Sequence, residues 1–172
     1  MTIILGIDPG SRVTGYGIIK ENNRKLEYID SGCIRTAEGE LSQRLLEIFN
    51  GICHLMETFN PHEVAIEEVF MHENPSSALK LGHARGVAMV ACASHRVKVS
   101  EYSAREVKLS LVGYGAAKKE QVKHMVVNLL MLNSSPQSDA ADALGIAICH
   151  SHMRNSPLAA SSRRSSTRRR VR

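Results

Sequence analysis

Apolar positions divide the first part of the chain into strands. Residues 3–7 form a nearly continuous apolar run, which is typical of a strand buried on both faces. Two further stretches, 14–20 and 25–36, are separated by a polar loop and also predict strands. Three strands joined by short polar connections predict an antiparallel meander. Gly15 and Gly17, inside the second strand, indicate either a close backbone approach or a bulge.

From residue 41 the apolar spacing changes to that of an amphipathic helix. Apolar side chains recur at three- and four-residue steps through residues 41–59, and Asn60-Pro61 ends this helix. A short strand is predicted over residues 63–70. It is apolar until it reaches two adjacent acids, Glu67 and Glu68.

A second helix is predicted from Pro75 to about Ser94, with Asn74 as its N-cap. Small residues cover much of its surface, so it is apolar nearly all round. Such a helix is buried on more than one side, and we expect it to face a second subunit as well as the sheet.

The remaining elements alternate a strand with helices. A strand is predicted over residues 97–102, followed by helices over 103–112 and 118–132, and by a last helix that Ser138 caps and that ends near Met153. This order of elements predicts an α/β domain with a mixed sheet.

Charge separates the chain into a domain and a tail. The net charge is +5, but seven of the 22 basic residues lie in residues 154–172, where there is no acid. Residues 1–153 therefore carry 15 basic and 17 acidic residues, a net charge of −2. The Arg/Ser-rich tail has no apolar periodicity, which predicts disorder. Sequence-independent attraction to phosphates and a purely solubilising role both stay open for it.

The spacing of the cysteines and the lack of long apolar runs indicate in which cellular compartment the protein is expected. The four cysteines lie far apart, without a C-x-x-C pair, which argues against a zinc site or a disulfide framework. No apolar run approaches 18 residues, and the first residues lead directly into a strand rather than a signal peptide. We therefore expect a soluble, cytoplasmic protein without membrane association.

Four acids close apolar segments at the edge of the predicted core. Asp8 ends the first strand, Glu67 lies near the end of the fourth, and Asp139 and Asp142 open the last helix with i,i+3 spacing. Each has a simpler explanation alone: Asp8 as a turn cap, Glu67 as a solvated strand end, and the helix acids as partners of the macrodipole. Their joint pattern favours a shared site.

Converging carboxylates need a counter-charge. Two unit charges 4 Å apart repel by roughly 4 kcal/mol at an effective dielectric near 20. Oxygen ligands without Cys or His select hard divalent ions, so the pattern predicts Mg²⁺, with Mn²⁺ as a substitute. Two such ions can activate water for phosphodiester cleavage.

Three motifs closely resemble the RuvC family of Holliday-junction resolvases. They are Gly6-Ile7-Asp8-Pro9-Gly10-Ser11-Arg12-Val13-Thr14-Gly15-Tyr16-Gly17, Ala65-Ile66-Glu67-Glu68-Val69-Phe70 and Asp139-Ala140-Ala141-Asp142-Ala143-Leu144. The resemblance covers about residues 1–153. It implies an RNase H-like fold with a mixed five-stranded sheet flanked by helices. It also implies a homodimer that nicks four-way DNA junctions at symmetric positions, leaving 5′-phosphates, and that acts with a RuvA–RuvB-type branch-migration complex.

The resemblance also implies roles for individual residues. The metal-binding and catalytic carboxylates are expected to be Asp8, Glu67, Asp139 and Asp142, with two ions per subunit and water as the nucleophile. Residues expected to contact DNA are Phe70, Arg85, Lys108, Lys118 and Lys119. Phe70 is expected to stack on an unpaired base, or else to end a core strand. Glu68 departs from the family's pattern, and strand alternation directs it away from the metal ligands.

Two other functions stay open at this point. The loop from Asp8 to Gly17 also resembles the first phosphate loop of actin-like and sugar-kinase ATPases, although 172 residues leave little room for a second lobe. A non-catalytic junction-binding module is the other alternative. The presence of all four acids argues against it.

Overall fold

The computed structural model describes residues 1–68 and 75–155. Phe70, the predicted cap Asn74 and the tail after residue 155 lie outside the described residues, so the predictions made for them stay predictions.

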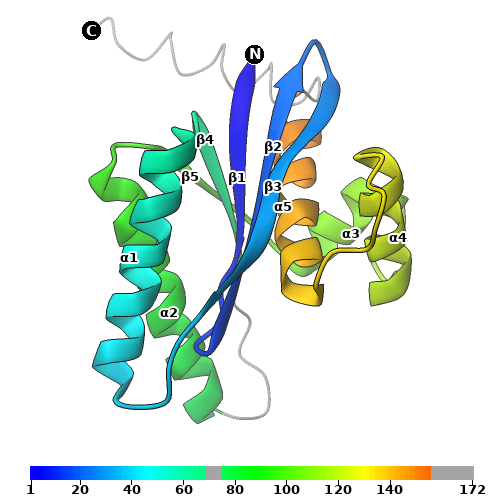
Figure 1. Ribbon diagram of the computed structural model, residues 1–172. Coiled ribbons are helices and arrows are strands. Elements are labelled where there is room, and N and C mark those ends of the chain that lie inside the picture. Colours follow the sequence, from blue (N-terminus) through cyan, green and yellow to red (C-terminus); the bar gives the residue numbers. More distant parts are fainter. Residues whose placement is uncertain (69–74, 156–172) are drawn as a thin grey trace, which may run out of the picture.

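Five strands form one mixed sheet, as predicted, and their order in the sheet is β3-β2-β1-β4-β5. The strands are β1 (Thr2–Asp8), β2 (Val13–Asn22), β3 (Lys25–Arg35), β4 (Glu63–Glu67) and β5 (Val99–Tyr102). The first three form the antiparallel meander, whereas β4 pairs in parallel with both β1 and β5. Figure 1 shows the sheet at the centre of the molecule.

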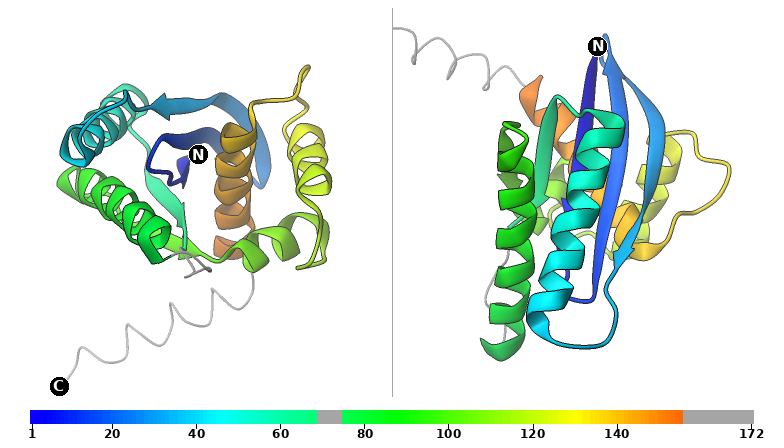
Figure 2. Two further views of the ribbon diagram at one scale, coloured as in Figure 1. Left: turned by 90° about the horizontal axis from the view of Figure 1, so that it is seen from below. Right: turned by 60° about the vertical axis from the view of Figure 1, so that its left-hand side comes forward.

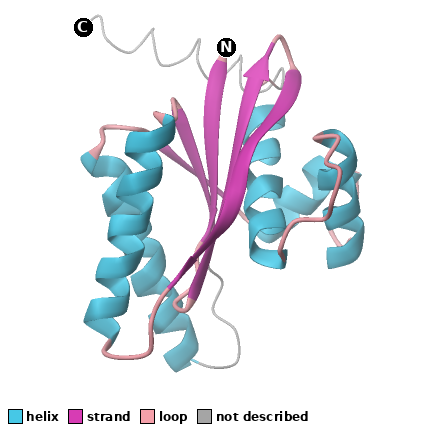
Figure 3. Ribbon diagram, in the orientation of Figure 1, coloured by secondary structure: helices cyan, strands magenta, loops and turns pink. Residues whose placement is uncertain are grey.

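Helices cover both faces of this sheet, so the domain has three layers (Figures 1 and 2). One face carries α1 (Leu41–Phe59) and α2 (Pro75–Ser94), and the other carries α3 (Ala104–Val112), α4 (Lys119–Leu129) and α5 (Ser138–Arg154). Figure 3 shows the same layers by type of secondary structure. Each face has its own hydrophobic cluster.

Alternation along β1 divides its side chains between the two clusters. Leu5 and Ile7 pack with α1 and α2, whereas Ile4 packs with the α5 side. All five residues from Ile3 to Ile7 are at least half-buried, and Ile4, Leu5 and Ile7 have no exposed surface. The prediction of a central strand covered on both faces is therefore confirmed.

Three glycines let α5 lie directly on the sheet. A Cβ atom at Gly6 would lie 2.1 Å from the carbonyl oxygen of Ala143, and one at Gly15 would lie 2.1 Å from that of Asp139. At Gly17 it would lie 2.6 Å from the amide nitrogen of Leu144. The predicted close backbone approach at Gly15 and Gly17 is thus confirmed, and the register of β2 with β3 also shifts just beyond Gly17, between Ile18 and Ile19. The close packing places the start of α5 beside the end of β1 and the start of β2.

Element ends differ from the prediction by a few residues. β4 ends at Glu67, β5 begins at Val99, and α4 ends at Leu129. The prediction that Ser138 caps the last helix is wrong, since the N-cap is Gln137, whose carbonyl oxygen accepts the amide of Ala141.

Arg154 is the last residue of α5, although its charge placed it in the tail. Its guanidinium lies 3.4 Å from Glu21 and 3.4 Å from Glu63. Ser151 and Asn155 also donate to Glu21. These contacts fasten the end of α5 to the sheet.

Among the helices of residues 1–68 and 75–155, none is both long and apolar enough to cross a bilayer.

Candidate active site

The predicted carboxylates come from the ends of three elements. Asp8 is the last residue of β1, and Glu67 is the last residue of β4. Because these strands are parallel neighbours, their carboxyl ends meet at one edge of the sheet. Asp139 and Asp142 lie in the first turns of α5, and Asp139 lies over Gly15, the residue that pairs with Asp8 across the sheet.

Three of the four carboxylates are close enough to share an ion. Asp8, Asp139 and Asp142 each offer one oxygen, and these oxygens lie within 4.8 Å of one another. Glu67 is hydrogen-bonded to Asp8 and lines the same pocket as Asp8 and Asp142. The pocket has a volume of about 330 Å³, and Lys108 and Lys119 also line it.

The crowded acids alter one another's protonation. Burial, followed by the charges of Glu67, Asp142 and Asp139, raises the pKa of Asp8 from 3.8 to about 8. Burial also raises the pKa of Glu67, against the effect of its hydrogen bond with Asp8. Without a bound cation, Asp8 therefore keeps its proton at neutral pH and donates it to Glu67. A divalent ion would favour the charged form of both groups.

Lys119 supplies positive charge to the cluster. Its Nζ lies 2.5 Å from Oδ2 of Asp142, and this hydrogen bond raises the pKa of Lys119. Lys119 is the first residue of α4, and its side chain remains about half exposed. Lys108, on α3, lines the same pocket and forms no ion pair within the described part of the chain. The ammonium of Lys108 is therefore available to a phosphate beside the carboxylates, whereas that of Lys119 is paired with Asp142.

The donor set fits a hard divalent cation. In residues 1–68 and 75–155 the cluster contributes carboxylate oxygens only, without a histidine or cysteine ligand. Oxygen ligands of this kind suit Mg²⁺ and Mn²⁺ better than zinc or copper. The raised pKa of Asp8 agrees with this, since a bound cation would offset the repulsion that disfavours its charged form.

Other predicted residues lie elsewhere. Arg85 donates from Nε to the carbonyl oxygen of Glu67 at 3.0 Å and pairs with Glu101, so it supports the strand end rather than lining the pocket. Its predicted DNA contact stays a prediction. Lys118 is exposed immediately before α4 and is not among the pocket-lining residues. Glu68 is exposed and outside the pocket lining, as alternation predicts.

Two features of the site were missed by sequence reasoning. One is the ion pair between Lys119 and Asp142, which depends on how α4 packs against α5 and leaves no sequence pattern. The other is Gly6, which lets α5 approach β1. Its signal was visible: a glycine interrupts an otherwise apolar strand, where it marks close contact with another backbone.

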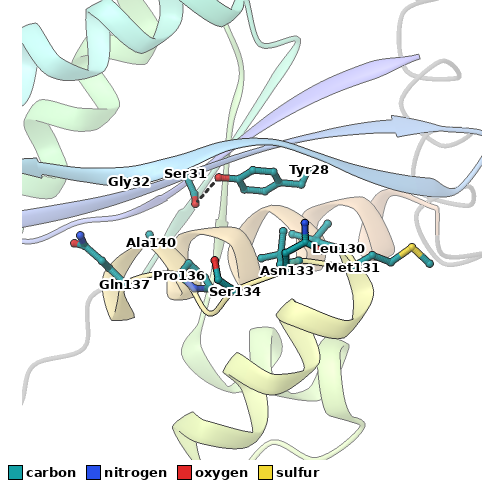
Figure 4. A pocket seen from close by; sticks show the side chains of 11 residues that line it. Tyr28, Ser31, Gly32, Leu130, Met131, Asn133, Ser134, Pro136, Gln137 and Ala140 are labelled. Carbon is teal, nitrogen blue, oxygen red and sulfur yellow. Dashed lines mark hydrogen bonds between the residues drawn. The ribbon is translucent and has the colours of Figure 1, made fainter.

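A separate hollow of about 420 Å³ lies on the other side of α5 (Figure 4). It lies between β3, with Tyr28 and Ser31, and the loop that leads to Gln137. Gln137 accepts a hydrogen bond from Arg35 at 2.8 Å, which ties this loop to β3. The residues that line the hollow include no acid and no cation. Unlike the acidic pocket, this hollow therefore offers no charged group to a ligand.

The fold and the pocket together place the chain among RNase H-like nucleases. The structure is similar to that of Thermus thermophilus RuvC in complex with Holliday junction substrate, with a TM-score of 0.84 and 32% identity, covering 89% of this chain and 94% of that one. The yeast mitochondrial Holliday junction resolvase Ydc2, at 16% identity and a TM-score of 0.58, covering 87% of this chain and 78% of that one, shares the fold.

Sequence comparisons give the particular family. The family model described as crossover junction endodeoxyribonuclease RuvC matches residues 4–150. Curated proteins of that name are 70% identical in Legionella pneumophila strain Lens, covering 100% of this chain and 99% of the relative, and 55% identical in Photobacterium profundum, covering 98% of each. The chain belongs to the RuvC family of crossover junction endodeoxyribonucleases. This membership confirms the resemblance and does not favour the ATPase alternative.

Proposed function

We propose that this chain resolves four-way DNA junctions by paired symmetric nicks, with Asp8, Glu67, Asp139 and Asp142 as its metal ligands. The observation that carries the proposal is the meeting of three carboxylates within 4.8 Å, beside two lysines, in a chain of the RuvC family. Two Mg²⁺ ions per subunit are the proposed cofactor, and Mn²⁺ is the proposed substitute.

The chain's own residues would divide the work between holding ions and placing phosphate. The four carboxylates hold the ions, and the parallel strand ends and the start of α5 fix their positions. When bound, the ions supply Lewis acidity that makes water a usable nucleophile and offsets charge on the leaving oxygen. Lys108 and Lys119 hold the scissile phosphate beside the carboxylates by charge, without reading bases.

Lys119 has a second task in this proposal. In the structure it pairs with Asp142, so it offsets part of the repulsion among the acids before an ion arrives. A cation held by Asp142 would take over this charge compensation, and the ammonium group of Lys119 would then be free to contact a phosphate.

The proposed catalytic unit is a homodimer formed through α2. Leu79 and Val90 are 66% and 61% exposed on this helix. Gly82 and Gly86 lie between them, at positions where an added Cβ atom would meet no neighbouring atom of the described residues within 4 Å. Their spacing puts all four on one face. An isologous dimer has a two-fold axis, and an open four-way junction has the same approximate symmetry. Two such sites would cut two strands at symmetric positions.

A RuvA–RuvB-type branch-migration complex is proposed as a further partner from the family resemblance. The basic tail is the proposed source of additional, sequence-independent attraction to DNA.

The test uses synthetic four-way junctions, labelled in turn on each strand and incubated with wild-type protein and Mg²⁺. We expect nicks in two opposed strands at the same position, and products that DNA ligase seals because the ends are 5′-phosphate and 3′-hydroxyl. EDTA should prevent the nicks. Intact junctions over a range of Mg²⁺ and Mn²⁺ concentrations, with binding retained, would favour the non-catalytic module. ATP turnover without DNA would favour the kinase-like alternative.

A further inference from the structure

A second hollow lies next to the acidic pocket, along the turn between α3 and α4, and is called the groove below. It has a volume of about 600 Å³ and shares two lining residues, Ala104 and Lys108, with the acidic pocket. The two hollows are therefore neighbours, with Lys108 lining both.

The lining of this groove is basic and aromatic. It contains two cations, Arg105 and Lys108, and no acid. Arg105 forms no ion pair within the described part of the chain, so its guanidinium is available to an external anion. Tyr114 and Leu109 also line the groove, with 64% and 54% of their surface exposed.

The turn that carries Tyr114 is fixed by backbone hydrogen bonds. Gly113 has a positive φ of 73° and ends α3, with its amide donating to the carbonyl oxygen of Leu109 at 2.9 Å. The carbonyl oxygen of Tyr114 accepts the amide of Ala117 at 3.2 Å. The ring is therefore exposed on a backbone that is already ordered, so stacking on it costs little conformational entropy.

Gly115 makes room for Arg105. A Cβ atom at Gly115 would lie 2.8 Å from Cγ of Arg105, so the arginine stem packs directly on this glycine. Both residues line the groove, so the contact holds the arginine stem in its lining.

We propose that this groove holds the nucleotides next to the scissile phosphate, with Arg105 on a backbone phosphate and Tyr114 stacked on a base. The inference rests on the proposed function, because it assigns the path of the strand that enters the acidic pocket. An anionic chain with flat bases that can stack matches what the groove offers: cations without acids in its lining, and an exposed ring. Because the groove adjoins the acidic pocket at Lys108, the proposed occupant is the cleaved strand rather than a separate ligand.

The test compares Arg105→Gln and Tyr114→Ser with matched surface controls, Arg24→Gln and Tyr28→Ser. Junction affinity is measured in an Asp8→Asn background, so that no strand is cut, and single-turnover cleavage is measured in the wild-type background. Thermal unfolding checks that each variant is folded. Arg105→Gln should weaken binding alike for all junction sequences and should reduce the slope of log K against log[salt] by about 1.

Tyr114→Ser should weaken binding about 5- to 150-fold, the range found for removing one base–aromatic stack. A set of junctions identifies the stacked base. Each junction carries a single abasic site, and the site is moved through the positions near the nick. At that position the abasic site should weaken binding of the Tyr114 protein but have no further effect on Tyr114→Ser. If the abasic site and Tyr114→Ser weakened binding additively at every position, Tyr114 would not stack on any of these bases.

Failure of the groove and failure of the proposed function give different results. If the wild type cuts junctions, and both groove variants bind and cut like their controls, the groove assignment is wrong and the nuclease function stands. If the wild type cuts nothing, the nuclease function is wrong, whatever the groove variants bind.

Discussion

At the scale of single residues, Asp8 has opposite requirements for stability and for the proposed function. The metal-free fold favours its protonated form, whereas metal binding would need the ionised form. Its carboxyl is half-buried beside three other acids, which raises its pKa to about 8. The folded, metal-free protein therefore holds a proton that the unfolded chain releases near pH 4. Unfolding releases this proton at intermediate pH, so the contribution of Asp8 to stability is greatest below about pH 4 and is lost as pH rises through about 8.

Replacing Asp8 by Asn should stabilise the metal-free protein at pH 8. The amide cannot ionise and can still donate a hydrogen bond to Glu67. One pKa unit corresponds to about 1.4 kcal/mol, and we expect a gain of at least that size in the free energy of unfolding. Urea denaturation in EDTA at pH 8 and at pH 4 measures it. The gain should shrink at pH 4, and an equal gain at both values would contradict the assigned protonation of Asp8.

Mg²⁺ should reverse this order of stability. An ion bound to the ionised carboxylates would stabilise the wild type by mass action, and Asp8→Asn lacks one of the proposed ligands. We expect a larger rise in Tm on Mg²⁺ addition for the wild type than for Asp8→Asn. Equal rises in the two proteins would argue against an ion at this cluster.

At the scale of elements, the site depends on how closely α5 lies on the sheet. The carbonyl oxygen of Asp139 lies so close to Gly15 on β2 that a methyl group does not fit between them. The obstructing atom belongs to the backbone, so no side-chain rotation relieves the contact. The helix has to move, and it carries two of the four acids.

Gly15→Ala should therefore cost about 2–3 kcal/mol of stability, in the range of overpacked cores, and should lower the cleavage rate more than junction affinity. Gly145→Ala, in the same helix, is the matched control. There the added methyl meets only ordinary contacts, the nearest at 3.5 Å from Leu111, and helix propensity improves by up to about 1 kcal/mol. A Gly15→Ala protein as stable and active as the control would contradict the role given to the close approach.

Sequence periodicity predicted the helices and strands well because each depends mainly on the spacing of apolar residues within its own segment. The helix over residues 41–59 and the helix from Pro75 to Ser94 have the predicted ends, and the carboxylates were identified because each closes an apolar segment. Contacts between distant segments were not predictable. The pairing of Lys119 with Asp142 and that of Arg85 with Glu101 depend on tertiary packing alone.

Histidine illustrates the same limit. His150 is buried, with Tyr102 at 2.8 Å and Glu63 at 2.7 Å from its ring nitrogens, and burial lowers its pKa. It lies two turns beyond Asp142 on α5, away from the acidic pocket. Its role is to join α5 to β4 and β5, which sequence spacing alone does not distinguish from a role at the site.

At the scale of the whole molecule, the proposed dimer makes cleavage symmetric. A charge on the exposed face of α2 should separate the subunits without unfolding them. Leu79→Glu with Val90→Glu should give a monomer by sedimentation and should replace paired nicks by single ones. Leu46→Glu, at a similarly exposed leucine on α1, should leave the oligomeric state unchanged. A double variant that remains dimeric would exclude this face as the interface.

The basic tail should act on affinity rather than on selectivity. Six of its arginines lie in residues 156–172, and changing all six to Gln keeps the length while removing the charge. We expect weaker binding to all DNA and a shallower salt dependence, with the preference for junctions kept. Gel-shift titrations of junction and duplex at several salt concentrations measure both effects. Unchanged affinity at low salt would show that the tail is passive.

The central claim is that the carboxylates at the ends of β1 and β4 and at the start of α5 cut four-way junctions. The most direct measurement is single-turnover cleavage of a synthetic junction by the wild type and by Asp8→Asn, at protein concentrations that saturate binding. Glu38→Gln, an exposed acid outside the pocket, is the control. We predict paired nicks by the wild type and the control, and bound but uncut junctions with Asp8→Asn. Cleavage by Asp8→Asn at the wild-type rate would contradict the account.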